Sequence, residues 1–121
     1  MAEIGTDIEK AASLLRRGKL VAIPTETVYG LAGDAFNEAA VLSIFEAKNR
    51  PQFDPLIVHS SGIEWVKEHV AEIPQIARRL MDEFWPGPMT LVLPKKDIVP
   101  DLVTSGLWTN QSWVGKHHYW F

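Results

Sequence analysis

The sequence predicts an α/β fold in which helices cover a sheet of short strands. Short apolar runs, which are typical of buried strands, alternate along the chain with segments whose apolar residues recur at helical spacing. The 121 residues are 46% hydrophobic and include no cysteine, so one ordinary domain can build its core without a disulfide framework. The sequence shows no internal repeat or interdomain linker, and we interpret it as one domain or the front part of one.

The first helix and the first strand are marked by the residues at their ends. Thr6-Asp7-Ile8-Glu9 is a capping-box pattern, in which the threonine hydroxyl and the glutamate carboxylate each accept a hydrogen bond from a free helix N–H. Apolar residues continue at helical spacing as far as Leu15, and Gly18 is the expected stop. Leu20-Val21-Ala22-Ile23, closed by Pro24, then predicts a buried strand that leads into a loop.

A second helix is expected to begin after Asn37, whose side chain can cap it. It is expected to end at Pro51, because the residue before a proline avoids the helical region. Leu56-Ile57-Val58-His59 follows as a second buried strand, and residues 63–70 are expected to form a third helix.

The last predicted elements are a helix and a strand joined by a proline-rich turn. The helix opens at Pro74, a residue favoured in the first helical turn, and stops before Trp85-Pro86-Gly87-Pro88. Thr90-Leu91-Val92-Leu93 is the third predicted strand.

The composition excludes several classes of protein. Twelve Lys and Arg against 15 Asp and Glu exclude a globally basic nucleic-acid binder but leave room for a local basic site. The lack of cysteine excludes thiolate catalysis and a cysteine-based zinc site. No apolar run approaches the roughly 18 residues that a membrane-spanning helix needs, and the first residues lack the features of a signal peptide. We therefore expect a cytoplasmic protein without a membrane partner.

Polar side chains follow the first predicted strand directly, in Pro24-Thr25-Glu26-Thr27-Val28-Tyr29-Gly30-Leu31. Ligands of open α/β sheets bind just beyond the carboxyl ends of strands, so these hydroxyls are candidate ligand contacts. The alternative interpretation is an ordinary turn, in which the threonines and the glutamate bind backbone groups and Tyr29 packs.

Lys48-Asn49-Arg50-Pro51 places two cations at the end of a predicted helix. The helix dipole favours cations there, which is sufficient as a structural explanation. A proline-stiffened turn with a point charge and a guanidinium fork is equally suited to bind a carboxylate or a polyphosphate. The spacing alone leaves both interpretations open.

His59 and Thr90 are the candidate site residues of the second and third strands. A lone histidine is more often structural, but the carboxyl end of a strand, where His59 lies, is a common place for a ligand contact. Phe84-Trp85-Pro86-Gly87-Pro88-Met89 forms a rigid turn before Thr90, whose hydroxyl can point into the same pocket or only complete the strand.

These segments together resemble the YrdC-like threonylcarbamoyl-AMP synthase family. The resemblance rests on the segment from Pro24 to Leu31, on Lys48-Asn49-Arg50-Pro51 leading to Pro55-Leu56-Ile57-Val58-His59, and on Trp85-Pro86-Gly87-Pro88-Met89-Thr90, in this order. It covers the chain from about Thr6 to Leu107. It implies a twisted, mixed, open sheet with helical cover and a concave, positively lined cavity.

The resemblance also implies an enzyme, a nucleotidyltransferase that makes threonylcarbamoyl-AMP and pyrophosphate from L-threonine, bicarbonate or CO2, and ATP. The product supplies the threonylcarbamoyl group for a tRNA adenosine, and Mg2+ accompanies the ATP. The implied macromolecular partners are tRNA or double-stranded RNA and other tRNA-modification proteins.

Site residues follow from the same resemblance. Thr27, His59 and Lys48 would contact L-threonine, while Arg50 and Thr90 would lie on the nucleotide side. Asp54 is placed on the nucleotide side as well, although family members often carry asparagine there and a carboxylate suits phosphates only if it faces a metal or solvent. No covalent catalyst is assigned, because positioning and charge neutralisation account for this chemistry.

The chain departs from the family pattern after Leu107. Residues 1–107 are interpreted as the front part of a YrdC-like domain, and residues 108–121 as an atypical tail. The tail is rich in tryptophan and lacks the Val-Arg-x-Pro and Ser-Ala-Asn motifs that follow in the family, so a truncated domain with a substituted or frame-shifted end is expected. Two other functions stay open: a non-catalytic RNA-binding or ribosome-associated module, and an inactive fragment of the synthase.

Overall fold

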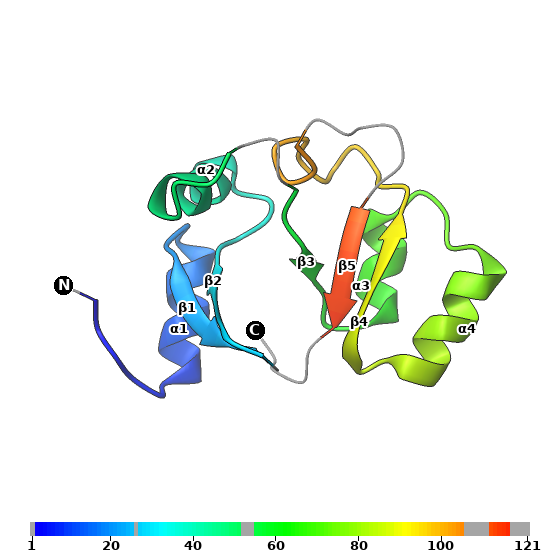
Figure 1. Cartoon of the computed structure of the whole chain (residues 1–121), viewed down its shortest axis with the longest axis horizontal. Coiled ribbons are helices and arrows are strands. Elements are labelled where there is room, and N and C mark those ends of the chain that lie inside the picture. The colour runs from blue at the N-terminus through cyan, green and yellow to red at the C-terminus, as the bar shows by residue number, and fades with distance from the viewer. Residues whose placement is uncertain (1, 26, 52–54, 106–111, 117–121) are drawn as a thin grey trace.

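The computed structural model describes residues 2–25, 27–51, 55–105 and 112–116, the last of these as backbone only. A two-stranded hairpin with helix α1 lies on the left of Figure 1, and a three-stranded sheet with helices α3 and α4 lies on the right. Helix α2 and the loop before residue 105 lie along the upper end of the view. The predicted α/β fold with a mixed open sheet and helical cover is confirmed.

Helix α1, Ile8–Arg16, forms where the spacing predicts it, but its cap is a different residue. The Asp7 side chain accepts a hydrogen bond from the Lys10 N–H at 3.0 Å, so Asp7 and not Thr6 is the N-cap. The capping-box interpretation was wrong by one residue. Threonine and aspartate are both favoured N-cap residues. Which of the two caps the helix depends only on the residue at which the backbone becomes helical.

The first predicted strand pairs with a strand that the sequence did not reveal. Strand β1, Val21–Pro24, runs antiparallel to β2, Tyr29–Ala32, with Pro24 opposite Tyr29. The interpretation of the segment from Pro24 to Leu31 as a loop is wrong for residues 29–31, which belong to β2. The four residues of β2 include a glycine and show no clear alternation, so only their hydrogen bonds to β1 identify them as a strand.

Helix α2, Glu38–Ala47, has the predicted cap but an earlier end. The Asn37 side chain accepts from the Ala40 N–H at 3.2 Å. The helix ends at Ala47 rather than at Pro51, because Lys48 takes the C-cap position and Asn49 adopts a left-handed backbone with a φ of 48°. Asparagine is one of the few residues that adopt this conformation readily, so it stops the helix before the proline does.

The three-stranded sheet consists of β3, Val58–His59, β4, Gly87–Leu93, and β5, Ser112–Lys116. β5 is the central strand, parallel to β3 and antiparallel to β4. β3 is shorter than the four predicted residues, whereas β4 begins at Gly87 and not at Thr90, with an irregularity between these two residues. The central strand lies within the segment that the sequence separated as a tail.

Helices α3, Ile63–His69, and α4, Gln75–Phe84, agree with the predicted ranges and cover one face of this sheet. Their contact with β4 forms the first core cluster, whose buried members are Val66, Val70, Ala77, Met81 and Leu93. None of the helices in the described ranges is both long and apolar enough to cross a membrane.

A second core cluster joins α2 to the sheet and to the loop that follows β4. Its buried members are Val41, Phe45, Val58, Val99 and Val103. The partly buried Trp65 of α3 packs against both clusters and connects them. The two clusters therefore hold α2, α3, α4 and the sheet together as one packed unit.

The packing of the second cluster can be tested by truncating two phenylalanines, one buried in the cluster and one largely exposed. Phe45 is 2% exposed in this cluster, whereas Phe84, at the end of α4, is 56% exposed. We expect Phe45→Ala to lower the free energy of unfolding by about 3–5 kcal/mol, as is typical of a buried phenylalanine. Phe84→Ala removes the same atoms from a largely solvated position and should cost much less, as measured by urea denaturation. Equal losses in the two variants would contradict this packing.

Candidate functional site

The hairpin turn between β1 and β2 is organised by the hydroxyl of Thr25. The Thr25 Oγ1 accepts hydrogen bonds from the backbone N–H of Thr27, at 3.4 Å, and of Val28, at 3.2 Å, and donates to the Val28 carbonyl. The Thr25 N–H donates to the same carbonyl at 3.0 Å. These bonds make a compact turn that presents Thr27 to solvent. Glu26 of the same motif lies outside the described residues.

The two cations after α2 have different environments. Lys48 is exposed at the C-cap position, where the helix dipole favours its charge. Arg50 is half-buried, and its Nη2 donates to the Pro55 carbonyl at 3.0 Å, while its backbone N–H donates to the Phe45 carbonyl at 2.9 Å. Arg50 therefore braces the loop that leads into β3. Asp54, in this loop, lies outside the described residues.

His59 and Thr90 lie in one row of the three-stranded sheet. Both are paired in register with the same residue of the central strand, Gly115. Residues directly opposite each other across a sheet point to the same face. Because glycine has no side chain, nothing from β5 stands between His59 and Thr90, whose backbones lie two strand spacings apart, or roughly 10 Å.

This row lies on the sheet face opposite α3 and α4. Leu91 and Leu93 pack against the first core cluster, and Val58 is in register with Leu91 through Val114. Since side chains alternate between faces along a strand, His59 and Thr90 point to the other face. His59 is exposed and Thr90 is half-buried, so a ligand can reach both of them from that face.

The predicted site residues fall into two groups in space. The arrows of β1, β3 and β5 all point downward in Figure 1, so the turn after β1, which carries Thr27, and His59 at the end of β3 both follow the carboxyl ends of strands that run in a similar direction. The carboxyl end of α2, which carries Lys48, lies at the upper end of the same view. The structure thus brings His59 and Thr90 into one row and leaves Lys48 on a separate segment.

Sequence reasoning missed two residues of this arrangement. Gly115 was assigned to the atypical tail, and a lone glycine in a short apolar run gives no sign that it lies between two other strands. Thr25 was one of several hydroxyls after a strand, and only the hydrogen bonds show that it builds the turn. The signal that did exist for Thr25 is the preference of threonine for such side-chain-to-backbone turns.

The candidate site residues that the structure describes carry hydroxyl groups, an imidazole ring and cationic groups, and they include no carboxylate. Among them, no group of three or more His, Asp or Glu side chains lies close enough to hold a metal ion. Magnesium in nucleotide sites is commonly bound through one or two carboxylates together with the phosphates. Such a site needs no cluster of three side chains, and the Mg2+ implied by the resemblance stays a prediction.

The role of Thr25 can be tested by removing its hydroxyl. We expect Thr25→Val to lower the free energy of unfolding by about 1 kcal/mol, because the turn loses side-chain hydrogen bonds to its backbone. Thr25→Ser keeps the hydroxyl and should retain most of this stability. Thr27→Val, the same change at the exposed tip, is the control and should have little effect in urea denaturation. A silent Thr25→Val would show that the turn does not need the hydroxyl.

Comparison with known proteins gives a consistent set of relatives. A family model named Sua5/YciO/YrdC and described as "Telomere recombination" matches residues 13–111. The threonylcarbamoyl-AMP synthase of Pyrococcus abyssi is 54% identical over 100 residues, which cover 83% of this chain and 29% of the relative. The threonylcarbamoyl-AMP synthase of Bacillus subtilis is 50% identical over 103 residues, which cover 84% of this chain and 30% of the relative.

Solved structures agree with these relatives. The crystal structure of Pyrococcus abyssi Sua5 complexed with L-threonine has a TM-score of 0.87 and 49% identity, and the match covers 93% of this chain and 32% of that one. A solution structure from Methanobacterium thermoautotrophicum has a TM-score of 0.73 and 26% identity. The chain spans about three-tenths of the length of these first two curated relatives. The match over most of its residues shows that the chain belongs to the Sua5/YciO/YrdC family.

Proposed function

We propose that this chain contributes the L-threonine site of a threonylcarbamoyl-AMP synthase. The observation that carries the proposal is the row of His59, Gly115 and Thr90 on the sheet face opposite α3 and α4. A relative of the same fold is titled as a complex with L-threonine, and curated relatives are named threonylcarbamoyl-AMP synthases. In this proposal L-threonine lies at the His59 side of the row and the nucleotide at the Thr90 side.

The proposed reaction depends on the positioning of its substrates rather than on a covalent intermediate with the enzyme. The amine of L-threonine captures CO2 as a carbamate, whose oxygen attacks the α-phosphorus of ATP and displaces pyrophosphate. The first step creates a negative charge on the carbamate and the second brings this anion to the ATP polyphosphate, so fixed donors and cations that stabilise the charge accelerate both. In the proposal Thr27 and His59 bind L-threonine, and Thr90 and Arg50 face the nucleotide. The L-threonine contact of Lys48, which lies on a separate segment at the end of α2, stays a prediction of the resemblance.

The proposal for Arg50 is supported by its place in the chain. Its hydrogen bond to the Pro55 carbonyl braces the loop that leads directly into β3 and His59. A guanidinium held in this way is a planar fork suited to two phosphate or carboxylate oxygens. Asp54, proposed for the nucleotide side, and Mg2+, proposed to accompany ATP, remain predictions.

The experiment that tests the function is the conversion of ATP to AMP and pyrophosphate by this chain, with and without L-threonine and bicarbonate. We expect AMP formation that depends on both. Calorimetric titration with L-threonine measures the binding site separately from turnover. L-threonine binding without turnover would support the alternative that this chain is an inactive part of the synthase. RNA binding without either activity would support the non-catalytic module, although the net charge of −3 disfavours it.

Replacing Arg50 with lysine tests its proposed role. We expect Arg50→Lys to reduce threonine-dependent pyrophosphate release by about 10- to 100-fold, because lysine keeps the charge but loses charge-assisted hydrogen bonds. Arg16→Lys, the same exchange on an exposed helix end, is the matched control and should leave release unchanged. Thermal denaturation of both variants separates a loss of activity from a loss of fold. Release at the unsubstituted level in Arg50→Lys would remove Arg50 from the site.

Filling the space between His59 and Thr90 tests the row itself. We expect Gly115→Val to weaken L-threonine binding about tenfold or more, because a branched side chain then occupies the face where both polar residues point. Gly115→Ala should give a smaller loss. Gly5→Val is the control, because a Cβ at Gly5 meets no other atom within 4 Å. Unchanged binding in Gly115→Val would place the L-threonine site elsewhere.

A further inference from the structure

A second basic site lies in the helical layer, where the connection between α3 and α4 meets the segment that follows β4. It is a hollow of about 320 Å3. Its charged lining is Lys67, Glu72, Arg78 and Lys96, and Val70 and Ile73 add apolar surface. Three cations therefore meet one carboxylate in a chain whose net charge is −3.

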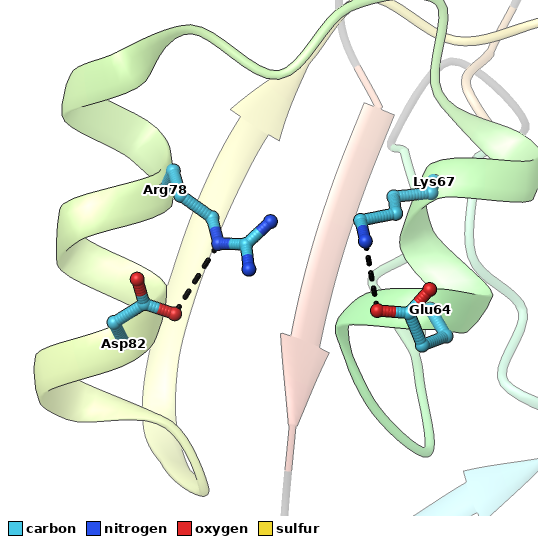
Figure 2. A network of polar contacts seen from close by, with 4 residues as sticks. All are labelled: Glu64, Lys67, Arg78 and Asp82. Carbon is cyan, nitrogen blue, oxygen red and sulfur yellow. Dashed lines mark hydrogen bonds and ion pairs between the residues drawn. The ribbon is translucent and has the colours of Figure 1, made fainter.

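Two of the cations project toward each other from different helices. Figure 2 shows Lys67 on α3 and Arg78 on α4 with their charged ends turned into the space between the two helices. Lys67 pairs with Glu64 at 2.8 Å, and Arg78 pairs with Asp82 through its Nε at 3.3 Å. The ion pair of Arg78, a residue that lines the hollow, uses Nε, which leaves the two Nη groups of its planar fork for a ligand.

These ion pairs are easily exchanged for an external anion. All four side chains are well exposed, from 43% for Lys67 to 79% for Glu64. Exposed pairs of this kind are weak, because water screens them and ordering two long side chains costs entropy. The two carboxylates therefore orient the two cations, and a ligand that binds the cations more strongly can displace the carboxylates.

The third cation is fixed by the backbone. The Lys96 N–H donates to the His69 carbonyl at 2.9 Å, and its Nζ donates to the Lys67 carbonyl at 3.1 Å. The Ala71 N–H donates to the Pro94 carbonyl at 2.7 Å, which ties the same two segments together. The hollow is thus formed before any ligand arrives. Its neighbour Lys95 differs, because its buried ammonium binds the Val99 carbonyl and Asp101 and supports the loop.

We propose that this hollow binds phosphoryl groups, either those of a free polyphosphate or those of an RNA backbone. A guanidinium fork and two ammonium groups around one small volume match the tetrahedral oxygens and multiple charges of such a ligand. The hollow is on the helix-covered side of the sheet, whereas His59 and Thr90 point to the other face. The proposal is therefore independent of the proposed synthase activity.

Glu64 reports on the occupancy of the hollow. A hydrogen bond from Lys67, followed by the positive charges of Lys67 and Arg78, holds the pKa of the Glu64 carboxyl below its usual range. A phosphoryl group that engages both cations brings negative charge toward Glu64 and competes for Lys67. The pKa of Glu64 should then rise toward its ordinary value, which a carboxyl-detected NMR titration measures.

The test uses the 121-residue chain and two probes, tripolyphosphate and a fluorescein-labelled single-stranded RNA. Tripolyphosphate is neither a substrate nor a product of the proposed reaction. Amide NMR shifts on titration should change most at Lys67, Ala71, Glu72 and Lys96. The probe that produces these shifts identifies the source of the phosphoryl groups.

Four variants sharpen the test. We expect Arg78→Gln and Lys96→Gln each to weaken binding about tenfold, the effect of losing one charge-assisted hydrogen bond. Arg79→Gln makes the same charge change one position along α4, outside the lining of the hollow, and should change binding by less than about twofold. Glu72→Gln removes the opposing carboxylate and should tighten binding. Far-UV circular dichroism confirms that each variant is folded.

The results that would overturn the proposal are equally specific. Binding of neither probe would refute it, as would amide shifts confined to other parts of the chain. An equal loss in Arg78→Gln and Arg79→Gln would show diffuse attraction to α4 rather than a site. These outcomes do not depend on whether the chain turns over ATP.

Discussion

The insertion of β5 between β3 and β4 is the constraint on which the rest of the structure depends. β3 has only two residues and β4 has no other described partner, so each of them belongs to a sheet through its hydrogen bonds to β5. Buried backbone donors and acceptors must be paired, which makes the central strand obligatory once α3 and α4 cover one face. The same pairing places His59, Gly115 and Thr90 in one row. Fold and candidate site are therefore set by one set of hydrogen bonds.

The helical layer has two separate consequences for function. It buries one face of the sheet through two core clusters joined by Trp65, and so leaves the opposite face for His59 and Thr90. It also gathers Lys67, Arg78 and Lys96 around a hollow of its own. Charged side chains on the outer surface of a helix normally remain separate in solvent. Here the short connection between α3 and α4 and the backbone bonds of Lys96 hold them around one volume.

Much of the fold could be predicted because the signals are local. The helices around Val41, Val66 and Met81 follow from apolar spacing and from residues at their ends. The predictions were wrong where either of two nearby residues could cap or end a helix. Asp7 caps α1 in place of Thr6, and Asn49 ends α2 before the proline. Short strands are the least predictable elements, because pairing partners that are distant in sequence decide where they begin and end.

The sequence by itself determined the α/β class, the order of the helices and the motifs that resemble the family, because each depends on residues close together in the chain. It also identified His59 and Thr90 as polar residues near strand ends. Only the tertiary structure decided that these two share a row, because a register across a third strand is a long-range property. The basic hollow has the same origin, since Lys67, Arg78 and Lys96 meet only after α3, α4 and the sheet pack together.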